Sequence, residues 1–160
     1  GEYGLAKSLG IDNVSAAMFI KRYFARYTGV AEYMQRTKEH AQQFGFVETL
    51  FGRKLYLPDI HSNQAVKRAG AERAAINAPM QGTASDLIKK AMIDVSKFLM
   101  NQKSRLVIQV HDELVLEVHE SELDWIQIKL PEIMSQVGAE VLNVPLLAEV
   151  GVGKNWDDAH

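Results

Sequence analysis

Two adjacent carboxylates stand inside an otherwise apolar stretch, in the segment Gln109-Val110-His111-Asp112-Glu113. Branched apolar residues on both sides of this segment predict two short strands. A tight turn between two such strands would hold the carboxylates rigidly at an open tip. Such a tip suits a divalent cation like magnesium, which takes few fixed oxygen ligands and keeps room for substrate phosphates. The residues alone leave a second interpretation open, because hairpin turns also carry charge simply by facing water.

His111 has three interpretations: a metal ligand, a general acid or a turn histidine. Together with Asp112 it resembles the His-Asp pairs of metal-dependent phosphohydrolases, but those pairs lie on helices, whereas this one lies between predicted strands. A phosphohydrolase site would also need further ligands from the remaining histidines, which show no ligand-like spacing: His40, His61, His119 and His160. The sequence has no phosphate-binding GxxxxGK loop, no HExxH motif and no serine nucleophile elbow.

A second set of polar residues follows a four-residue spacing: Arg73, Asn77 and Gln81. This spacing places them on one line if the helix continues through or just past Pro79. All three donate hydrogen bonds, and every Watson–Crick pair offers acceptors at similar minor-groove positions, so such a line can check pair shape without reading sequence. The alternative is a solvated helix face on which Glu72 pairs with Arg68.

Apolar periodicity predicts the elements of the first half. We expect a helix from Asn13, its N-cap, to Gly29, its stop, and a second helix over 30–45. Residues 46–57 predict a β-hairpin. An alanine-rich helix follows over 63–78, and Pro79 should end or kink it.

The second half alternates helices and strands. Thr83 and Asp86 resemble a capping box that opens another helix, with its apolar face over 87–99. The acidic hairpin follows, then a helix over 122–138 interrupted near Pro131, and a final strand at 146–150. Helices mixed with mostly antiparallel strands predict an α+β fold, with an antiparallel sheet packed on helices.

Composition bounds the protein class. The 160 residues suffice for one domain or two subdomains, and 47% hydrophobic with 24% charged residues is ordinary for a globular protein. Cysteine is absent, which excludes disulfides and thiolate metal sites. No apolar run is long enough to span a bilayer and no signal-peptide pattern is present, so we expect a cytoplasmic protein without membrane partners. Residues 1–73 carry a net charge of +4 and residues 74–160 carry −6, which suits a phosphate-binding part beside a metal-binding part.

Four stretches resemble the C-terminal portion of bacterial family A DNA polymerases, the DNA polymerase I type. They are TLFGR at 49–53, LPDI at 57–60, AERAAINAPMQGTA at 71–84 and QVHDE at 109–113, the last resembling the family's motif C. The resemblance runs over essentially the whole chain. It implies a helical fingers portion over 1–77, which includes the hairpin near 46–57, and part of a palm over 78–160.

The resemblance also implies roles for single residues. Asp112 would be a palm metal ligand, Glu113 its acidic neighbour, and His111 a residue near the primer terminus. Arg73, Asn77 and Gln81 would contact the primer–template near its newest pair. Basic residues of the fingers and of their junction with the palm would contact DNA: Arg53, Lys54, Lys67 and Arg68. The terminal His160 resembles the family's usual chain end.

The same resemblance implies a reaction and its partners. The complete enzyme would add deoxynucleotides to a primer 3′ end by two-metal phosphoryl transfer with two Mg²⁺ ions. Its partners would be primer–template DNA, deoxynucleoside triphosphates and the upstream remainder of the polymerase, near the nucleoid of a bacterial cytoplasm.

Several parts of the family have no counterpart in this sequence: an upstream aspartate motif, the fingers helix that holds the incoming nucleotide, the thumb and the exonuclease. We therefore expect the chain alone to be inactive. The alternative to a polymerase segment is a stand-alone nucleic-acid-binding module, whose footprint would be the basic first half and the polar line. Salt-dependent DNA binding without metal-dependent turnover would favour that module over a phosphohydrolase.

Overall fold

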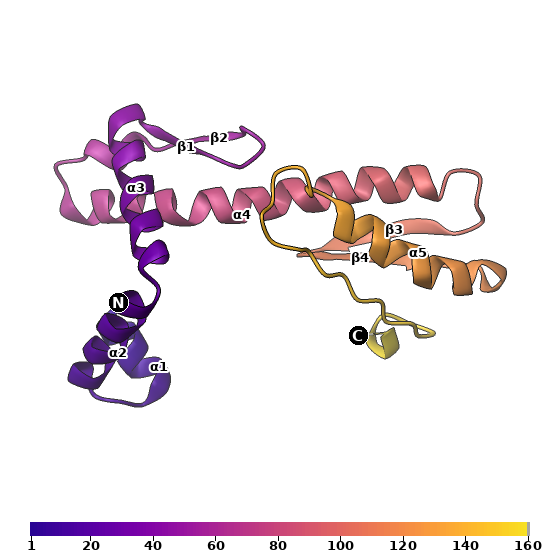
Figure 1. The fold of residues 1–160 in the computed structure, drawn as a ribbon, viewed down its shortest axis with the longest axis horizontal. Coiled ribbons are helices and arrows are strands. Elements are labelled where there is room, and N and C mark those ends of the chain that lie inside the picture. The colour runs from indigo at the N-terminus through magenta and orange to yellow at the C-terminus, as the bar shows by residue number, and fades with distance from the viewer. Residues whose placement is uncertain (160) are drawn as a thin grey trace. The chain divides into compact units, whose positions relative to one another are not determined.

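The computed structural model describes residues 1–159, which form two compact units (Figure 1). The first unit combines Gly1–Val47 with Lys54–Ala78, and the second combines Glu48–Arg53 with the chain from Pro79 onward. Helix α4 (Ala65–Phe98) contributes residues to both units. The expectation about the chain end at His160 falls outside the described residues.

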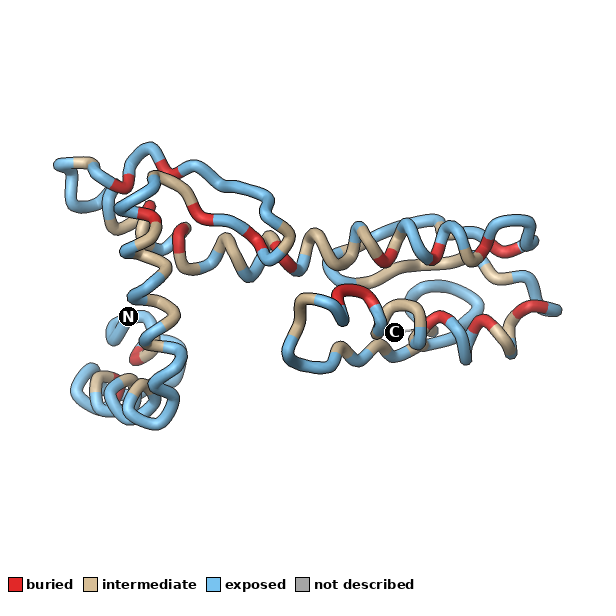
Figure 2. Tube along the Cα trace, turned by 45° about the horizontal axis from the view of Figure 1, so that its top comes forward, coloured by how far each residue is buried: buried red, intermediate tan, exposed pale blue. Residues whose placement is uncertain are grey.

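The first unit is mainly helical. Before α4 it contains α1 (Glu2–Leu9), α2 (Asn13–Arg26), α3 (Thr28–Phe44), β1 (Phe46–Glu48), β2 (Lys54–Tyr56) and the 3-10 helix η1 (Pro58–His61). Small and branched side chains fill its core: Ala41, Val47, Leu57, Ile60, Ala71 and Ala75. Figure 2 shows these buried positions distributed over α3, the hairpin, η1 and α4. The alanines predicted to line one helix therefore serve close packing between elements.

The first two helix boundaries differ from the sequence prediction. Asp12 rather than Asn13 is the N-cap of α2, because its carboxylate accepts a hydrogen bond from the Ser15 N–H at 2.9 Å. The predicted stop at Gly29 is wrong: α2 ends at Arg26 with Tyr27 as its C-cap, and Gly29 lies inside α3. Helix α1 was not predicted at all.

The β1–β2 hairpin is confirmed. Gly45 is the C-cap of α3 and has a φ of 75°, in the left-handed region that glycine adopts most easily. The two strands then pair, and the Thr49 N–H donates to the Arg53 carbonyl at 2.9 Å where the hairpin closes. Phe46 and Val47 of β1 and all of β2 belong to the first unit, whereas residues Glu48–Arg53 belong to the second.

Pro79 does not end the helix, because α4 runs from Ala65 to Phe98 with Pro79 inside it. Proline lacks the N–H for its intrahelical bond, but neighbouring groups add others. The Thr83 hydroxyl donates to the Pro79 carbonyl at 2.6 Å and accepts from the Leu50 N–H at 3.0 Å. Thr83 is therefore a mid-helix residue, and the capping box predicted from Thr83 and Asp86 is wrong.

The second unit packs a two-stranded sheet on helices. Besides the second part of α4 it contains β3 (Arg105–Val110), β4 (Glu113–Glu117), the 3-10 helices η2 (Glu120–Glu122) and η3 (Asp157–Ala159), and α5 (Leu123–Gln136). Strands β3 and β4 are antiparallel, with a bulge between Leu106 and Ile108. The buried core lies between α4 and α5, and leucines from the sheet pack against it. The predicted α+β arrangement, a sheet packed on helices, is confirmed.

Two expectations for the C-terminal part are wrong. Pro131 lies inside α5 without interrupting it, and residues 146–150 form no strand. Strand-forming residues need a free partner edge, and the described residues pair none with this segment. Val150 packs against the core of the second unit instead. No helix in the described part of the chain is long and apolar enough to cross a membrane.

A buried carboxylate joins the start of β3 to the start of α5. Glu122 is 8% exposed and accepts hydrogen bonds from the N–H groups of Lys103 and Ser104, both at 3.0 Å, and from the Ser104 hydroxyl at 2.6 Å. That hydroxyl in turn accepts from the His119 N–H at 2.9 Å. Hydrogen bonds, first from Lys103 and then from Ser104, outweigh desolvation and lower the pKa of Glu122.

We expect Glu122→Gln to destabilise the second unit at neutral pH and to weaken its acid sensitivity. Because the folded-state pKa lies below the ordinary value of 4.5, the ionised carboxylate stabilises the fold above that value. This stabilisation is lost as the pH falls through the folded pKa. Urea unfolding followed by Trp125 fluorescence, at neutral pH and below the ordinary pKa, measures the effect, since Trp125 packs on Phe98 with ring centroids 4.7 Å apart.

Glu120→Gln is the matched control for this experiment, because Glu120 is exposed and lies two residues from Glu122. Its urea midpoint should stay at the wild-type value. Equal midpoints for Glu122→Gln and the wild type at neutral pH would contradict the assignment.

Candidate active site

The turn between β3 and β4 contains only two residues. The last pair of the ladder joins Val110 to Glu113, so His111 and Asp112 form the whole loop. Both loop side chains are exposed, whereas Glu113 begins β4 and is half-buried. A two-residue loop fixes the register of its strands and the backbone positions from which its own side chains project. The predicted tight turn that presents Asp112 is therefore confirmed.

His111 has an unusual backbone conformation for a residue with a side chain. Its φ is 51°, the positive sign that a type II′ turn requires at its first central position, where glycine is usual. Histidine is one of the few other residues enriched at positive φ. The Gln109 side chain donates to the His111 carbonyl at 2.5 Å and so holds the turn from the adjoining strand. Backbone strain of this kind is common at functional sites.

The turn offers ligands for a hard cation. Asp112 presents exposed carboxylate oxygens, which are the ligand type that Mg²⁺ prefers, so the donor set fits such an ion. Glu113 already interacts with neighbouring groups. Within residues 1–159, no group of three or more His, Cys, Asp or Glu side chains is placed to hold a metal. A complete metal site at this turn would therefore need ligands from a substrate or from further polypeptide.

Among the described residues, no other histidine joins a group of side chains that could hold a metal. His40 Nδ1 lies 3.1 Å from the Phe46 carbonyl oxygen in the first unit, and His119 Nδ1 lies 2.9 Å from the Ser121 hydroxyl. The ligands that a phosphohydrolase built on His111 and Asp112 would need are thus missing from the part of the chain that the structure describes.

The polar line lies on one uninterrupted helix. Arg73, Asn77 and Gln81 are all exposed on α4, which continues through Pro79 as the line requires. The first two belong to the first unit, and Gln81 belongs to the second, as does the turn. The alternative pairing of Glu72 with Arg68 is not formed: the Arg68 side chain donates to the Ser62 carbonyl at 3.1 Å instead.

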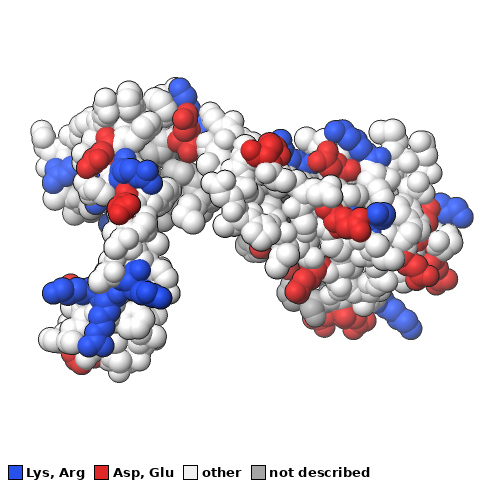
Figure 3. Space-filling view, viewed as in Figure 1, with Lys and Arg blue, Asp and Glu red and all other residues white. Residues whose placement is uncertain are grey.

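Basic side chains are prominent in the first unit. Figure 3 shows Lys and Arg gathered over α1 and α2, and a mixture of both charges over the second unit. Lys67 and Arg68 are exposed near the start of α4. The Lys54 ammonium lies 4.2 Å from the centre of the Phe46 ring, a cation–π contact.

Arg53 is engaged within the second unit. Its Nε donates to Asp86 Oδ1 at 2.8 Å and its Nη2 donates to the Gly82 carbonyl at 2.9 Å. Asp86 is therefore an ion-pair partner and not part of a helix cap, and Gly82 is an acceptor that no motif in the sequence indicates. Their involvement follows from a contact between residues about 30 positions apart, which no local pattern reveals.

Comparison with known proteins gives consistent matches. A family model described as DNA polymerase family A matches residues 1–158. DNA polymerase I of Pseudomonas aeruginosa is 53% identical over 160 residues, and that of Geobacillus stearothermophilus is 47% identical. Each alignment covers 99% of this chain, but the chain spans only 17% and 18% of these relatives. The structure is also similar to the POL domain of Pol1 from M. smegmatis in complex with DNA primer-template and dNTP, with a TM-score of 0.92 and 41% identity over 99% of this chain and 28% of that one.

We expect His111→Val to destabilise the β3–β4 hairpin and His111→Gly to leave it intact. A β-branched residue at positive φ costs roughly 1–2 kcal/mol, whereas glycine adopts this conformation freely. Chemical unfolding of the two variants, followed by Trp125 fluorescence, measures the difference. Equal stability of the two variants would show that the turn does not depend on the conformation of His111.

Proposed function

Because this chain belongs to DNA polymerase family A, we propose that it is a fingers and palm segment of a DNA-directed DNA polymerase. Residues 1–77 would belong to the fingers and residues 78–160 to the palm. The observation that carries the proposal is the exposed two-residue turn with Asp112, in a chain whose family match covers residues 1–158. The similar solved structure holds DNA primer-template and dNTP, which supports DNA and nucleotides as partners here.

The turn supplies the chemistry in this proposal. Asp112 would hold Mg²⁺ through its exposed carboxylate, with Glu113 as the adjacent acidic group. Bound Mg²⁺ activates an attacking hydroxyl and stabilises the leaving group in phosphoryl transfer. The rigid two-residue loop would keep the Asp112 carboxylate in one place while the substrate changes. His111 would lie near the primer 3′ end.

Helix α4 would contact the duplex. Arg73, Asn77 and Gln81 are exposed donors along one continuous helix, and we assign them to the minor groove at the newest base pair. The exposed cations Lys54, Lys67 and Arg68 would contact DNA phosphates, which positions the duplex without reading its sequence. A copying enzyme needs contacts of this sequence-independent kind.

The remaining parts of the site would come from an upstream remainder of the polymerase, working in the bacterial cytoplasm near the nucleoid. This part of the proposal agrees with the small share of the relatives that the chain spans. It also agrees with the shortage of metal ligands among residues 1–159.

The isolated 160-residue chain should not extend a primer. Correct positioning of the reactants lowers a reaction barrier by several kcal/mol. Residues 1–159 contain no complete group of metal ligands, and we expect the site for the incoming nucleotide to come from the upstream remainder. A primer-extension assay with Mg²⁺ or Mn²⁺ tests this, with a complete polymerase as the positive control. Template-directed extension by the purified chain would overturn the expectation.

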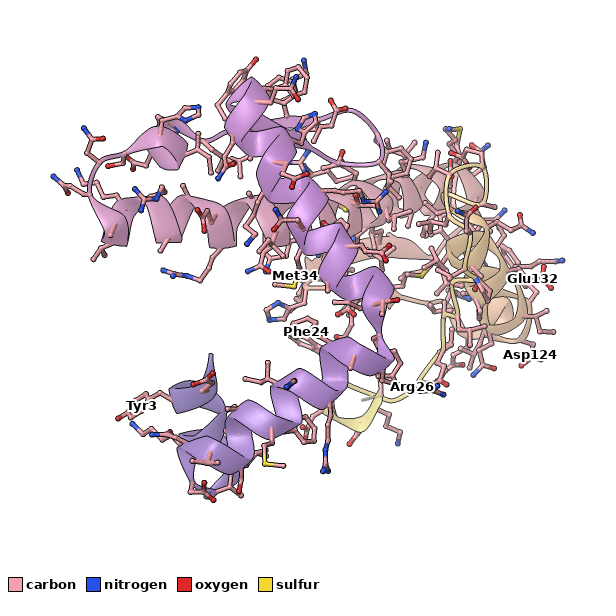
Figure 4. All side chains as sticks on the ribbon, turned by 60° about the vertical axis from the view of Figure 1, so that its left-hand side comes forward. Tyr3, Phe24, Arg26, Met34, Asp124 and Glu132 are labelled. Atoms are coloured by element: carbon pink, nitrogen blue, oxygen red, sulfur yellow. The ribbon has the colours of Figure 1, made fainter. Side chains whose placement is uncertain are left out.

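In the complete polymerase, Asp112→Asn should lower turnover roughly 100-fold or more while DNA affinity stays nearly constant. The substitution keeps the shape of the side chain but removes the charge that holds the metal. Asp124→Asn is the control, because Asp124 is an exposed carboxylate on α5 (Figure 4). Glu113→Gln should have a milder effect. Near-normal turnover of Asp112→Asn would show that Asp112 does not hold the metal.

A further inference from the structure

The tip of the β1–β2 hairpin, residues 49–53, is attached to α4 by several contacts. The Leu50 N–H donates to the Thr83 hydroxyl at 3.0 Å, and the Lys90 ammonium lies 4.9 Å from the centre of the Phe51 ring. The tip is itself stiffened by Thr49, whose hydroxyl accepts from the N–H groups of Phe51 and Arg53, both at 3.2 Å. All of these residues lie in the second unit.

Arg53 forms polar contacts with two separate positions of α4. Its guanidinium donates to the Gly82 carbonyl and to the Asp86 carboxylate, so it joins two positions one turn apart on α4. The Asp86 side chain is only 13% exposed, compared with 51% for Arg53. Desolvation raises the pKa of Asp86, but the influence of the nearby Thr49 hydroxyl, the hydrogen bond from Arg53 and the charges of Arg53 and Lys89 outweigh it, so the pKa is lowered and the carboxylate stays ionised at neutral pH.

The helix and the tip approach each other closely at Gly82. A Cβ atom at this position would lie 2.6 Å from Thr49 Cγ2, a distance that real contacts do not allow. Glycine therefore lets the tip meet the helix backbone directly. The point of contact is one residue from Gln81 and three residues from Pro79, where α4 lacks an intrahelical hydrogen bond.

We propose that Arg53 is a positioning residue and not a phosphate contact: through Gly82 and Asp86 it holds the hairpin tip on α4 and thereby fixes the placement of Gln81. The inference rests on the role proposed above for Gln81 at the newest base pair. Two of the three guanidinium nitrogens are already used inside the protein, and Asp86 neutralises the charge that a phosphate would need. Small displacements of a substrate-positioning group are costly, since a 1 Å error can reduce rates about 100-fold.

The test uses the complete polymerase with Arg53→Ala, Arg53→Lys and Asp86→Asn, alone and combined with Gln81→Ala. Asp94→Asn is the matched control: Asp94 is an exposed carboxylate on the same helix, paired with Lys97 at 3.4 Å. Two quantities are measured: the ratio of extension rates from matched and mismatched primer ends, and the slope of log Kd for DNA against log salt concentration. Thermal unfolding of each variant reports its stability.

We expect Arg53→Ala and Asp86→Asn to lower extension from a matched end roughly tenfold and to reduce the matched-to-mismatched ratio, which is also the effect expected of Gln81→Ala. Combining either with Gln81→Ala should add little, because residues that act through one another are not additive. Arg53→Lys should recover only part of the ratio, since lysine cannot donate to both partners in the same geometry. The salt slope should not change, and Asp94→Asn should behave as the wild type.

The outcomes separate the alternatives. A salt slope reduced by about one in Arg53→Ala would identify a phosphate contact and overturn the inference. Arg53→Ala and the shape-preserving Asp86→Asn could both lower thermal stability and leave the matched-to-mismatched ratio unchanged. That result would show that the contact only stabilises the fold, and it would also overturn the inference. If Gln81→Ala changes the matched-to-mismatched ratio but the Arg53 and Asp86 variants do not, only this inference is overturned. No effect of Gln81→Ala overturns the role proposed for Gln81 and the inference with it.

Discussion

Helix α4 stays continuous across Pro79, and both units of the chain are built on this helix. In the first unit it contributes Ala71 and Ala75 to the core, and in the second it contributes Val95, with Leu99 following directly after its last residue. A proline inside a helix removes a hydrogen bond and commonly costs about 3 kcal/mol. Contacts from the hairpin tip and the Thr83 hydroxyl act within one turn of this weak point, so tertiary structure stabilises what the local sequence disfavours.

The β3–β4 hairpin depends on constraints at both of its ends. At one end, Glu122 binds the backbone that leads into β3. At the other end, a two-residue turn holds His111 at positive φ and presents Asp112 to solvent. Leucines on one face of the sheet pack on the core between α4 and α5. The Asp112 carboxylate is thus carried by a short, well-anchored ladder, which is the kind of support that a metal ligand needs to keep its position.

The two groups of candidate site residues need different kinds of structural support. A metal ligand needs one carboxylate in a fixed place, which a tight turn provides. Residues that test the shape of a base pair need donors at a regular spacing, which positions four residues apart on a helix provide. Two of the cations assigned to DNA already make contacts inside the protein, Arg68 with Ser62 and Lys54 with Phe46, so their availability to phosphates depends on how weak those exposed contacts are.

Local sequence determined the features that depend on neighbouring residues. Branched residues around 109–113 predicted the hairpin and its turn, and Gly45 marked the end of α3. The spacing of Arg73, Asn77 and Gln81 predicted a helical line only on the condition that the helix continues past Pro79. The family motifs also identified the family that the comparisons show. Both kinds of signal lie in short stretches of the chain, where residue type and spacing are sufficient.

Tertiary contacts determined the structure wherever they and local sequence preferences favoured different conformations. Pro79 and the apparent Thr83–Asp86 cap predicted a helix break, but α4 is continuous there, and Thr83 and Asp86 are bound by Leu50 and Arg53, about 30 residues earlier. The apolar residues at 146–150 formed no strand because no sheet edge in the described chain pairs with them. The family resemblance assigned Arg53 to DNA, and the fold gives it in addition an ion-pair partner, Asp86, that is distant in sequence. In each case the outcome depends on whether a partner distant in sequence is present, and local residue propensities carry no information about such a partner.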